Sequence, residues 1–140
     1  MTLKPTIVQI TDLSLVVVRA DKDREPEIKA AWRTLESKLT SLKGRKFYGV
    51  CQNEGDGMVY YAGLEPLSPE EVQQLALPTL FLKGGKYVRV KLSDWPRHTD
   101  QISSIVEELK KSFCTDPARP LLEHYRSHSE LHLLAPLAEN

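Results

Sequence analysis

An acidic residue near the C-terminal end of the chain stands between an aliphatic and an aromatic residue at alternate positions, Leu121, Glu123 and Tyr125. In a β-strand these three side chains point to one face, because successive side chains alternate between the two faces. If that face is covered, the Glu123 carboxylate requires a proton, a hydrogen-bond donor or a cation, and an aromatic-lined cavity would accept an organic cation. The alternative is a solvated Glu123, or one paired with a Lys or Arg, as is usual for a Glu in a strand.

Three histidines recur at four-residue spacing, His124, His128 and His132, and on a helix they would line up for a metal ion. Pro120 and the polar break at residues 127–129 favour a strand, a turn and a second strand instead. In that arrangement the three rings do not converge, and no acidic or cysteine partner completes a set of ligands. We interpret them as solvated turn histidines and expect no metal.

Other chemical motifs are weak. Cys51 and Cys114 lie far apart without CxxC spacing, which predicts reduced packing residues rather than a disulfide. The glycines of GGK at 84–86 lack the spacing of a phosphate-binding loop and open a strand, so they predict a turn. No Ser/His/Asp or Cys/His arrangement is visible, although catalytic residues need not be neighbours in sequence.

The composition sets limits on the class of protein. The 140 residues are 41% hydrophobic and 27% charged with a formal net charge of zero, which predicts one globular domain over 1–140. Lys and Arg are scattered, so direct DNA binding is not expected. The longest apolar run, residues 13–18, is too short to span a membrane, and residues 1–5 do not resemble a signal peptide. We expect a cytoplasmic protein that does not bind membranes.

The elements that must position these residues occur twice in the same order. Residues 6–19 predict a strand bent near Asp12, residues 23–44 an amphipathic helix, and residues 45–52 and 58–67 an antiparallel hairpin. After a connector at 68–76 with a short turn of helix, residues 77–92 predict a strand interrupted at Gly84-Gly85. A helix at about 96–113 and two strands, at 120–126 and 131–137, complete the second half.

The predicted fold is therefore α+β. Two strand-helix-strand-strand modules, at about 5–67 and 77–138, should form one antiparallel sheet in a pseudo-twofold arrangement. Neither half can cover its own sheet, so both long helices should pack on the combined sheet. A central groove between the halves follows from this arrangement.

Several strings in this order resemble the gyrase-inhibitor-like family, which includes the effector-binding domains of AraC-type and MerR-type multidrug regulators. They are WxxLxxxL at 32–39, YG at 48–49, YYAGLE at 60–65, LKGGKY at 82–87 and LLEHY at 121–125. Strand signal begins within the first ten residues, so we expect no helix-turn-helix segment ahead of this free-standing form.

The resemblance implies a site for hydrophobic, aromatic or cationic compounds, built as an aromatic box around a buried acid. It implicates Glu123, and the remaining candidate ligand-binding residues are Trp32, Tyr48, Tyr60, Trp95, Thr99 and Tyr125. On periodicity alone Trp32 is a core residue beside Leu35, and the aromatic residues of the strands suit strands regardless of function.

Three functions remain open at this point. The first is a non-catalytic binder for sensing or sequestration, whose partner is a separate regulator. The second is a small hydrolase of reactive compounds with Glu123 as base and Tyr48 as proton donor. The third is a protein binder with gyrase as its partner, as in the inhibitors that name the family. Haem binding would need an axial histidine in the groove, and none is evident, so we expect no cofactor.

Overall fold

The computed structural model describes residues 4–22, 24–55 and 57–138. Its strands are β1 (Thr6–Ile10), β2 (Leu13–Arg19), β3 (Phe47–Asn53), β4 (Met58–Leu64), β5 (Thr79–Leu82), β6 (Gly85–Ser93), β7 (Leu121–Tyr125) and β8 (Glu130–Pro136). Its α-helices are α1 (Glu25–Ser37), α2 (Pro69–Leu75) and α3 (Ile102–Ser112), and two 3₁₀ turns, η1 (Trp95–Arg97) and η2 (Thr99–Gln101), precede α3. The eight strands form one sheet of order β1-β6-β8-β7-β3-β4-β2-β5, in which each neighbouring pair is antiparallel.

The sheet order shows the internal repeat. One half places β6, β8 and β7 side by side and the other places β2, β4 and β3 in the same way, so the halves meet where β7 pairs with β3. Each half then takes its edge strand from the other, since β1 pairs with β6 and β5 pairs with β2. The predicted α+β fold of two strand-helix-strand-strand modules in one antiparallel sheet is confirmed.

The two exchanging segments cross where both predicted strands are interrupted. The backbone N–H of Gly84 donates to Asp12 Oδ1 at 2.7 Å. A Cβ atom at position 84 would lie within 3.0 Å of backbone atoms of Ile10, Thr11 and Asp12. Only glycine fits this crossing, because backbone atoms cannot move aside as the end of a flexible side chain can.

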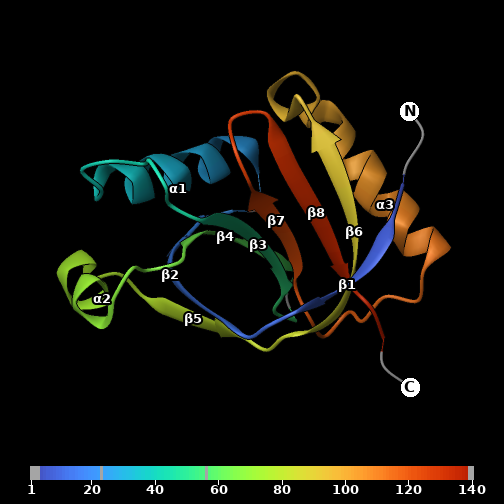
Figure 1. Ribbon diagram of the computed structural model, residues 1–140, viewed down its shortest axis with the longest axis horizontal. Coiled ribbons are helices and arrows are strands. Elements are labelled where there is room, and N and C mark those ends of the chain that lie inside the picture. The colour runs from blue at the N-terminus through green and yellow to red at the C-terminus, as the bar shows by residue number, and fades with distance from the viewer. Residues whose placement is uncertain (1–3, 23, 56, 139–140) are drawn as a thin grey trace.

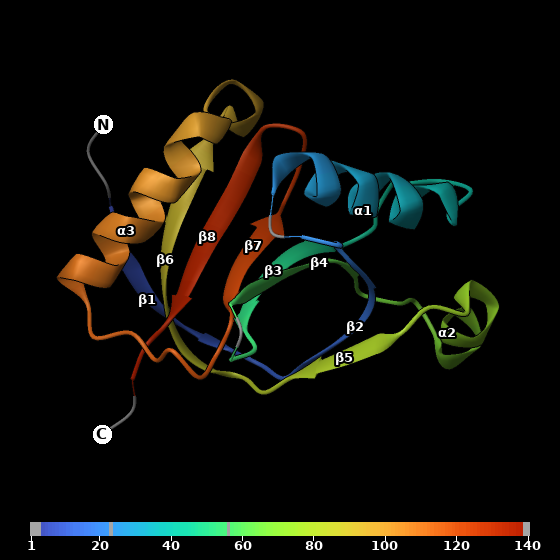
Figure 2. The same cartoon turned by 180° about the vertical axis from the view of Figure 1, so that it is seen from behind.

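The sheet is curled, and the two long helices lie on its outer side (Figures 1 and 2). We call this side the helix face. It carries two apolar clusters, one under α1 that includes Val16, Leu35 and Leu64, and one under α3 that includes Val90 and Leu109. The opposite side, the inner face, carries a third cluster to which β2, β3, β5, β6, β7 and β8 contribute buried residues. The central strands β3, β7 and β8 are therefore packed on both faces.

Both helix predictions ran too long. Helix α1 ends at Ser37 rather than near Gly44, and Leu42 is 44% exposed. The last turn tightens, because the Lys38 and Leu39 N–H groups donate to the carbonyls three residues back, of Leu35 and Glu36. The second helix begins at Ile102 instead of Pro96, because residues 95–101 form the 3₁₀ turns.

None of the helices in the described ranges is long and apolar enough to cross a membrane.

Candidate functional site

Glu123 lies in the middle of β7 on the helix face, where its register partners are Gly49 and Leu133. Its Oε1 atom accepts two hydrogen bonds, one from the Tyr60 hydroxyl at 2.7 Å and one from the Tyr125 hydroxyl at 2.8 Å. The Tyr60 oxygen in turn accepts a bond from the indole N–H of Trp32 at 3.0 Å. A chain of hydrogen bonds thus runs from α1 to the carboxylate.

Strand alternation and helix packing bring these groups together. Tyr125 follows Glu123 by two residues, so both side chains share a face. Tyr60 shares the face of Ala62, which pairs with Gly49 across β3 and β4. Trp32 lies one turn before the buried Leu35 on the side of α1 that packs against the sheet.

Gly49 makes room for the carboxylate. A Cβ atom at this position would come within 3.0 Å of both Glu123 Oε1 and Tyr60 Oη. Gly49 is itself buried. The hydrogen bond between Tyr60 and Glu123 therefore passes over the one position in β3 that has no side chain to block it.

An aromatic cluster surrounds these hydrogen bonds. The Tyr125 ring lies edge-on to two tryptophans, with centroid distances of 5.4 Å to Trp32 and 5.1 Å to Trp95. Phe47 contacts Trp32 in the same manner at 6.0 Å. The Trp95 indole N–H donates to the Ser127 carbonyl oxygen at 3.1 Å, which fixes η1 against the β7–β8 turn. Both modules thus supply rings to one cluster.

The two tyrosine hydroxyls are held as proton donors. Burial raises the pKa of Tyr60 well above its ordinary value, and the neighbouring Glu123 charge raises it further, while the Trp32 bond opposes the shift. Burial and the Glu123 charge raise the pKa of Tyr125 in the same way. Both phenols therefore keep their protons at neutral pH, and hydroxyl donors of this kind orient a carboxylate and stabilise its negative charge.

The structure gathers most of the candidate residues into this cluster. Glu123, Trp32, Tyr60 and Tyr125 are joined by hydrogen bonds, and Trp95 joins them through its ring contact with Tyr125.

Two other candidates lie apart from it. Tyr48 points to the inner face, where it is 7% exposed and stacks on the His124 ring at 4.3 Å. Thr99 is exposed in η2, and no hydrogen bond joins it to the cluster in the described part of the chain. The pairing of Tyr48 with Glu123 is therefore not available in this geometry, and Tyr60 and Tyr125 occupy that place.

Sequence reasoning missed Phe47 and Gly49. The signal was present in the strand alternation, because Phe47 and Gly49 share a face and Tyr48 must take the other. A shift of one residue exchanges the two faces of a strand. Tyr48 was chosen from the string YG, but it is Gly49 that lies opposite Glu123, so Tyr48 points to the other face of β3.

The histidine interpretation was wrong in part. His128 is exposed in the turn as expected. His124 and His132 are instead cross-strand partners on the inner face, with ring centroids 6.0 Å apart, and His132 is 6% exposed. The hairpin register causes this, because the turn around His128 pairs the residue four positions before it with the residue four positions after it. Within the described residues no group of three His, Cys, Asp or Glu side chains is placed to hold a metal ion.

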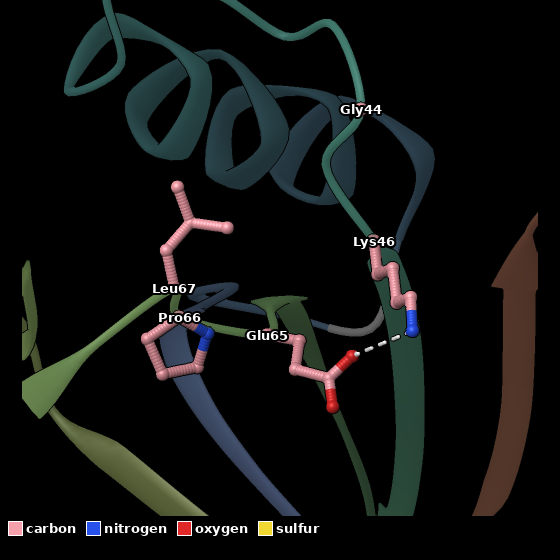
Figure 3. A pocket seen from close by; sticks show the side chains of 5 residues that line it. All are labelled: Gly44, Lys46, Glu65, Pro66 and Leu67. Atoms are coloured by element: carbon pink, nitrogen blue, oxygen red, sulfur yellow. Dashed lines mark ion pairs between the residues drawn. The ribbon is translucent and has the colours of Figure 1, made fainter.

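Two cavities of about 230 Å³ lie elsewhere on the molecule. One is bordered by Lys46 and Glu65, whose charged groups are 3.8 Å apart, and by Gly44, Pro66 and Leu67 (Figure 3). The other lies beside Arg19 and Glu54 near the β3–β4 turn. Neither includes Glu123, which is half-buried beside the aromatic cluster, and the groove expected between the halves stays a prediction.

No family model and no curated protein matches this chain. Solved structures share its fold. An integron cassette protein from the mobile metagenome of Vibrio cholerae is 18% identical, with a TM-score of 0.72 over 96% of this chain and 95% of that one. The protein SAV2435, solved bound to tetraphenylphosphonium, is 16% identical, with a TM-score of 0.71 over 99% and 94%. A hydrolase from Listeria innocua is 12% identical, with a TM-score of 0.62 over 96% and 92%. At these identities the likeness concerns the fold.

Proposed function

We propose that this chain is a gyrase-inhibitor-like effector-binding domain that binds amphipathic aromatic cations at Glu123, for sensing or sequestration in the cytoplasm. The observation that carries the proposal is the half-buried carboxylate held by two tyrosine hydroxyls inside a cluster of aromatic rings. Its partner in signalling is a separate regulator chain.

The chemistry of the cluster selects for cations. A carboxylate attracts positive charge, and the faces of Trp and Tyr rings attract it as well, by about 0.5–2 kcal/mol per ring. The rings also bury the apolar surface of an amphipathic compound. Because Trp32 and Trp95 reach Tyr125 from different modules, a bound ligand would contact both halves of the molecule.

A protein of the same fold, SAV2435, was solved with tetraphenylphosphonium, a hydrophobic cation. This supports the choice of ligand class for the present chain. It also supplies a probe whose size and charge suit an aromatic site.

A titration of rhodamine 6G followed by fluorescence polarisation tests the proposal. The wild-type protein should bind the dye saturably, and Glu123→Gln should bind at least about tenfold more weakly, since a neutral amide keeps the shape of the side chain and removes its charge. Glu107→Gln, on the exposed side of α3, is the matched control and should bind normally. Equal affinity in Glu123→Gln and wild type, with both folded by circular dichroism, would refute the proposal.

A second candidate is the hydrolysis of a reactive small molecule at the same cluster. It is favoured by hydroxyl donors that contact a carboxylate, the arrangement of a general acid beside a general base, and by the Listeria innocua hydrolase with this fold. In this scheme Glu123 takes a proton from water and Tyr60 donates one to the leaving group. Time-dependent conversion of a bound electrophile, followed by mass spectrometry, distinguishes it from reversible binding.

A further inference from the structure

The inner face of the sheet carries a second group of polar side chains that could bind a ligand. This group lies directly behind Glu123. Across four neighbouring strands the register places Lys91 of β6, His132 of β8, His124 of β7 and Tyr48 of β3 in one row. Because Glu123 and His124 are consecutive in β7, they point to opposite faces. The row is therefore separate from the proposed cation site.

The two imidazoles of this row are held in a confined place. His132 is only 6% exposed, and among the described residues no other polar or charged residue, tyrosines aside, is buried. Its Nε2 lies 2.7 Å from Glu130 Oε2. His124 is sandwiched between the Tyr48 ring, at 4.3 Å, and the His132 ring, at 6.0 Å. Neither ring can turn away without disturbing its neighbours.

Positive charge predominates around these rings. Arg126, Arg89, Lys91 and Lys46 act on the row, and the carboxylates that act on it are Glu130 and Glu65. The Nε atom of Arg89 is buried and has no hydrogen-bond partner within the described part of the chain. The row thus offers unused donor capacity in a region where cations outnumber acids.

Both histidines have lowered pKa values in these surroundings, although Glu130 contacts His132. Burial first, and then the charges of Arg126, His132 and Lys46, lower the pKa of His124 to about 4. Burial likewise lowers the pKa of His132, against the opposing effect of Glu130. An anion beside these rings would reverse the shift, because it stabilises the protonated forms and offsets the repulsion between them and the arginines.

We propose that this row, the His124–His132 face, is a binding site for a small oxyanion, a carboxylate or a phosphate group. The imidazole N–H groups and the Arg89 guanidinium donate to its oxygens, and Arg126 contributes charge at the hairpin end. Binding strengthens as the pH falls from neutral while the oxyanion keeps its charge, because protonated imidazoles supply extra donors and charge. The site does not depend on the cation-binding function proposed for Glu123.

The test is a two-dimensional ¹H–¹⁵N NMR titration of the histidine side chains with inorganic phosphate and, separately, with sodium acetate, against sodium chloride at equal ionic strength. Saturable shifts of His124 and His132, but not of the exposed His128, are expected with one or both oxyanions. The anion that binds shows whether the site prefers a carboxylate or a phosphate group. The midpoint of the His124 titration should move to higher pH with that anion present.

Charge-neutralising variants distinguish binding of the anion at a specific site from nonspecific electrostatic attraction of anions to the protein. Arg89→Gln should weaken anion binding at least about tenfold, whereas Arg33→Gln, on the exposed side of α1, should leave it unchanged. Chloride shifts equal to those of both oxyanions, shifts that never saturate, or equal weakening by both variants would overturn the proposal. Loss of dye binding in Glu123→Gln with intact oxyanion shifts would leave it standing.

Discussion

Tyr60 is the residue through which the helix and the sheet share one hydrogen-bond network. It is 3% exposed, donates to Glu123 and accepts from Trp32. Removing its hydroxyl therefore leaves two partners without their bond inside a poorly solvated cluster. Such losses cost more than the bond itself contributes, because the orphaned groups have already left water.

Tyr60→Phe should lower the free energy of unfolding by about 1–3 kcal/mol. Chemical denaturation measures the change. Tyr61→Phe is the matched control, since its hydroxyl bonds to Glu54 at the surface and should cost less than about 1 kcal/mol. Equal effects of the two substitutions would show that the network adds nothing to stability.

Gly49 sets the distance between the same groups. Gly49→Ala should destabilise the protein by about 1–3 kcal/mol, because the added methyl displaces the Glu123 carboxylate or the Tyr60 ring. It should also weaken binding of rhodamine 6G. Gly63→Ala is a comparison in the neighbouring strand, where the Cβ would meet Leu15 at 3.1 Å, and it should leave dye binding intact. A Gly49→Ala protein with normal stability and affinity would contradict this role.

At the residue scale, the sequence indicated which types of residue form the cluster better than it indicated the face of the strand on which each side chain lies. Glu123, Tyr60, Tyr125 and the two tryptophans of the cluster were candidate residues through the family resemblance, whereas periodicity alone made Trp32 a core residue. The face of β3 was not predicted, because strand boundaries are uncertain by a residue or more and each shift of one exchanges the faces. Tyr48 therefore lies on the inner face against His124.

At the scale of elements, the crossing of the two exchanged strands leaves no room for a side chain at Gly84. Gly84 lies against the backbone of residues 10–12, and the bond from its N–H to Asp12 links the two segments. The order of strands and helices could be predicted, because hydrophobic periodicity and glycine punctuation mark each element. The edge exchange could not, because pairing between distant strands leaves no local signal.

Gly84→Ala should lower the free energy of unfolding by at least about 2 kcal/mol, because the methyl group meets backbone atoms that cannot repack. This loss should exceed that of any surface substitution in β5 or β6. Thermal unfolding measures the loss. Lys83→Ala, at the exposed neighbouring position, should change stability by less than about 0.5 kcal/mol. A Gly84→Ala protein as stable as Lys83→Ala would show that the crossing has room for a methyl group.

Helix ends were the other point at which sequence reasoning failed. The apolar spacing of Leu39 and Leu42 continues past Ser37, yet the helix ends there with two bonds of the 3₁₀ type, from Lys38 N–H to the Leu35 carbonyl and from Leu39 N–H to the Glu36 carbonyl. Leu39 still packs against the α1 cluster from the irregular segment, which explains why the spacing looked helical.

At the scale of the whole molecule, the buried histidines make stability depend on pH. Their pKa values are lower in the folded protein than in the unfolded chain, to about 4 for His124, so the unfolded chain binds more protons between those values. Stability should therefore be full above about pH 6.5 and fall as the pH decreases toward 4.

Urea denaturation at a series of pH values measures this dependence. His124→Gln should flatten the decline between about pH 6.5 and 4, whereas His128→Gln, in the exposed turn, should not. A wild-type stability that is constant across this window would show that His124 is not held neutral by its surroundings.

In the proposed function, ligands are selected by their positive charge at Glu123. Isothermal titration with tetraphenylphosphonium and tetraphenylborate tests it most directly, because the two ions share size and shape and differ in the sign of their charge. The phosphonium should bind to the wild-type protein at least about tenfold more tightly than the borate, and Glu123→Gln should remove most of this preference. Equal affinity for the two ions, or a preference that survives in Glu123→Gln, would contradict it.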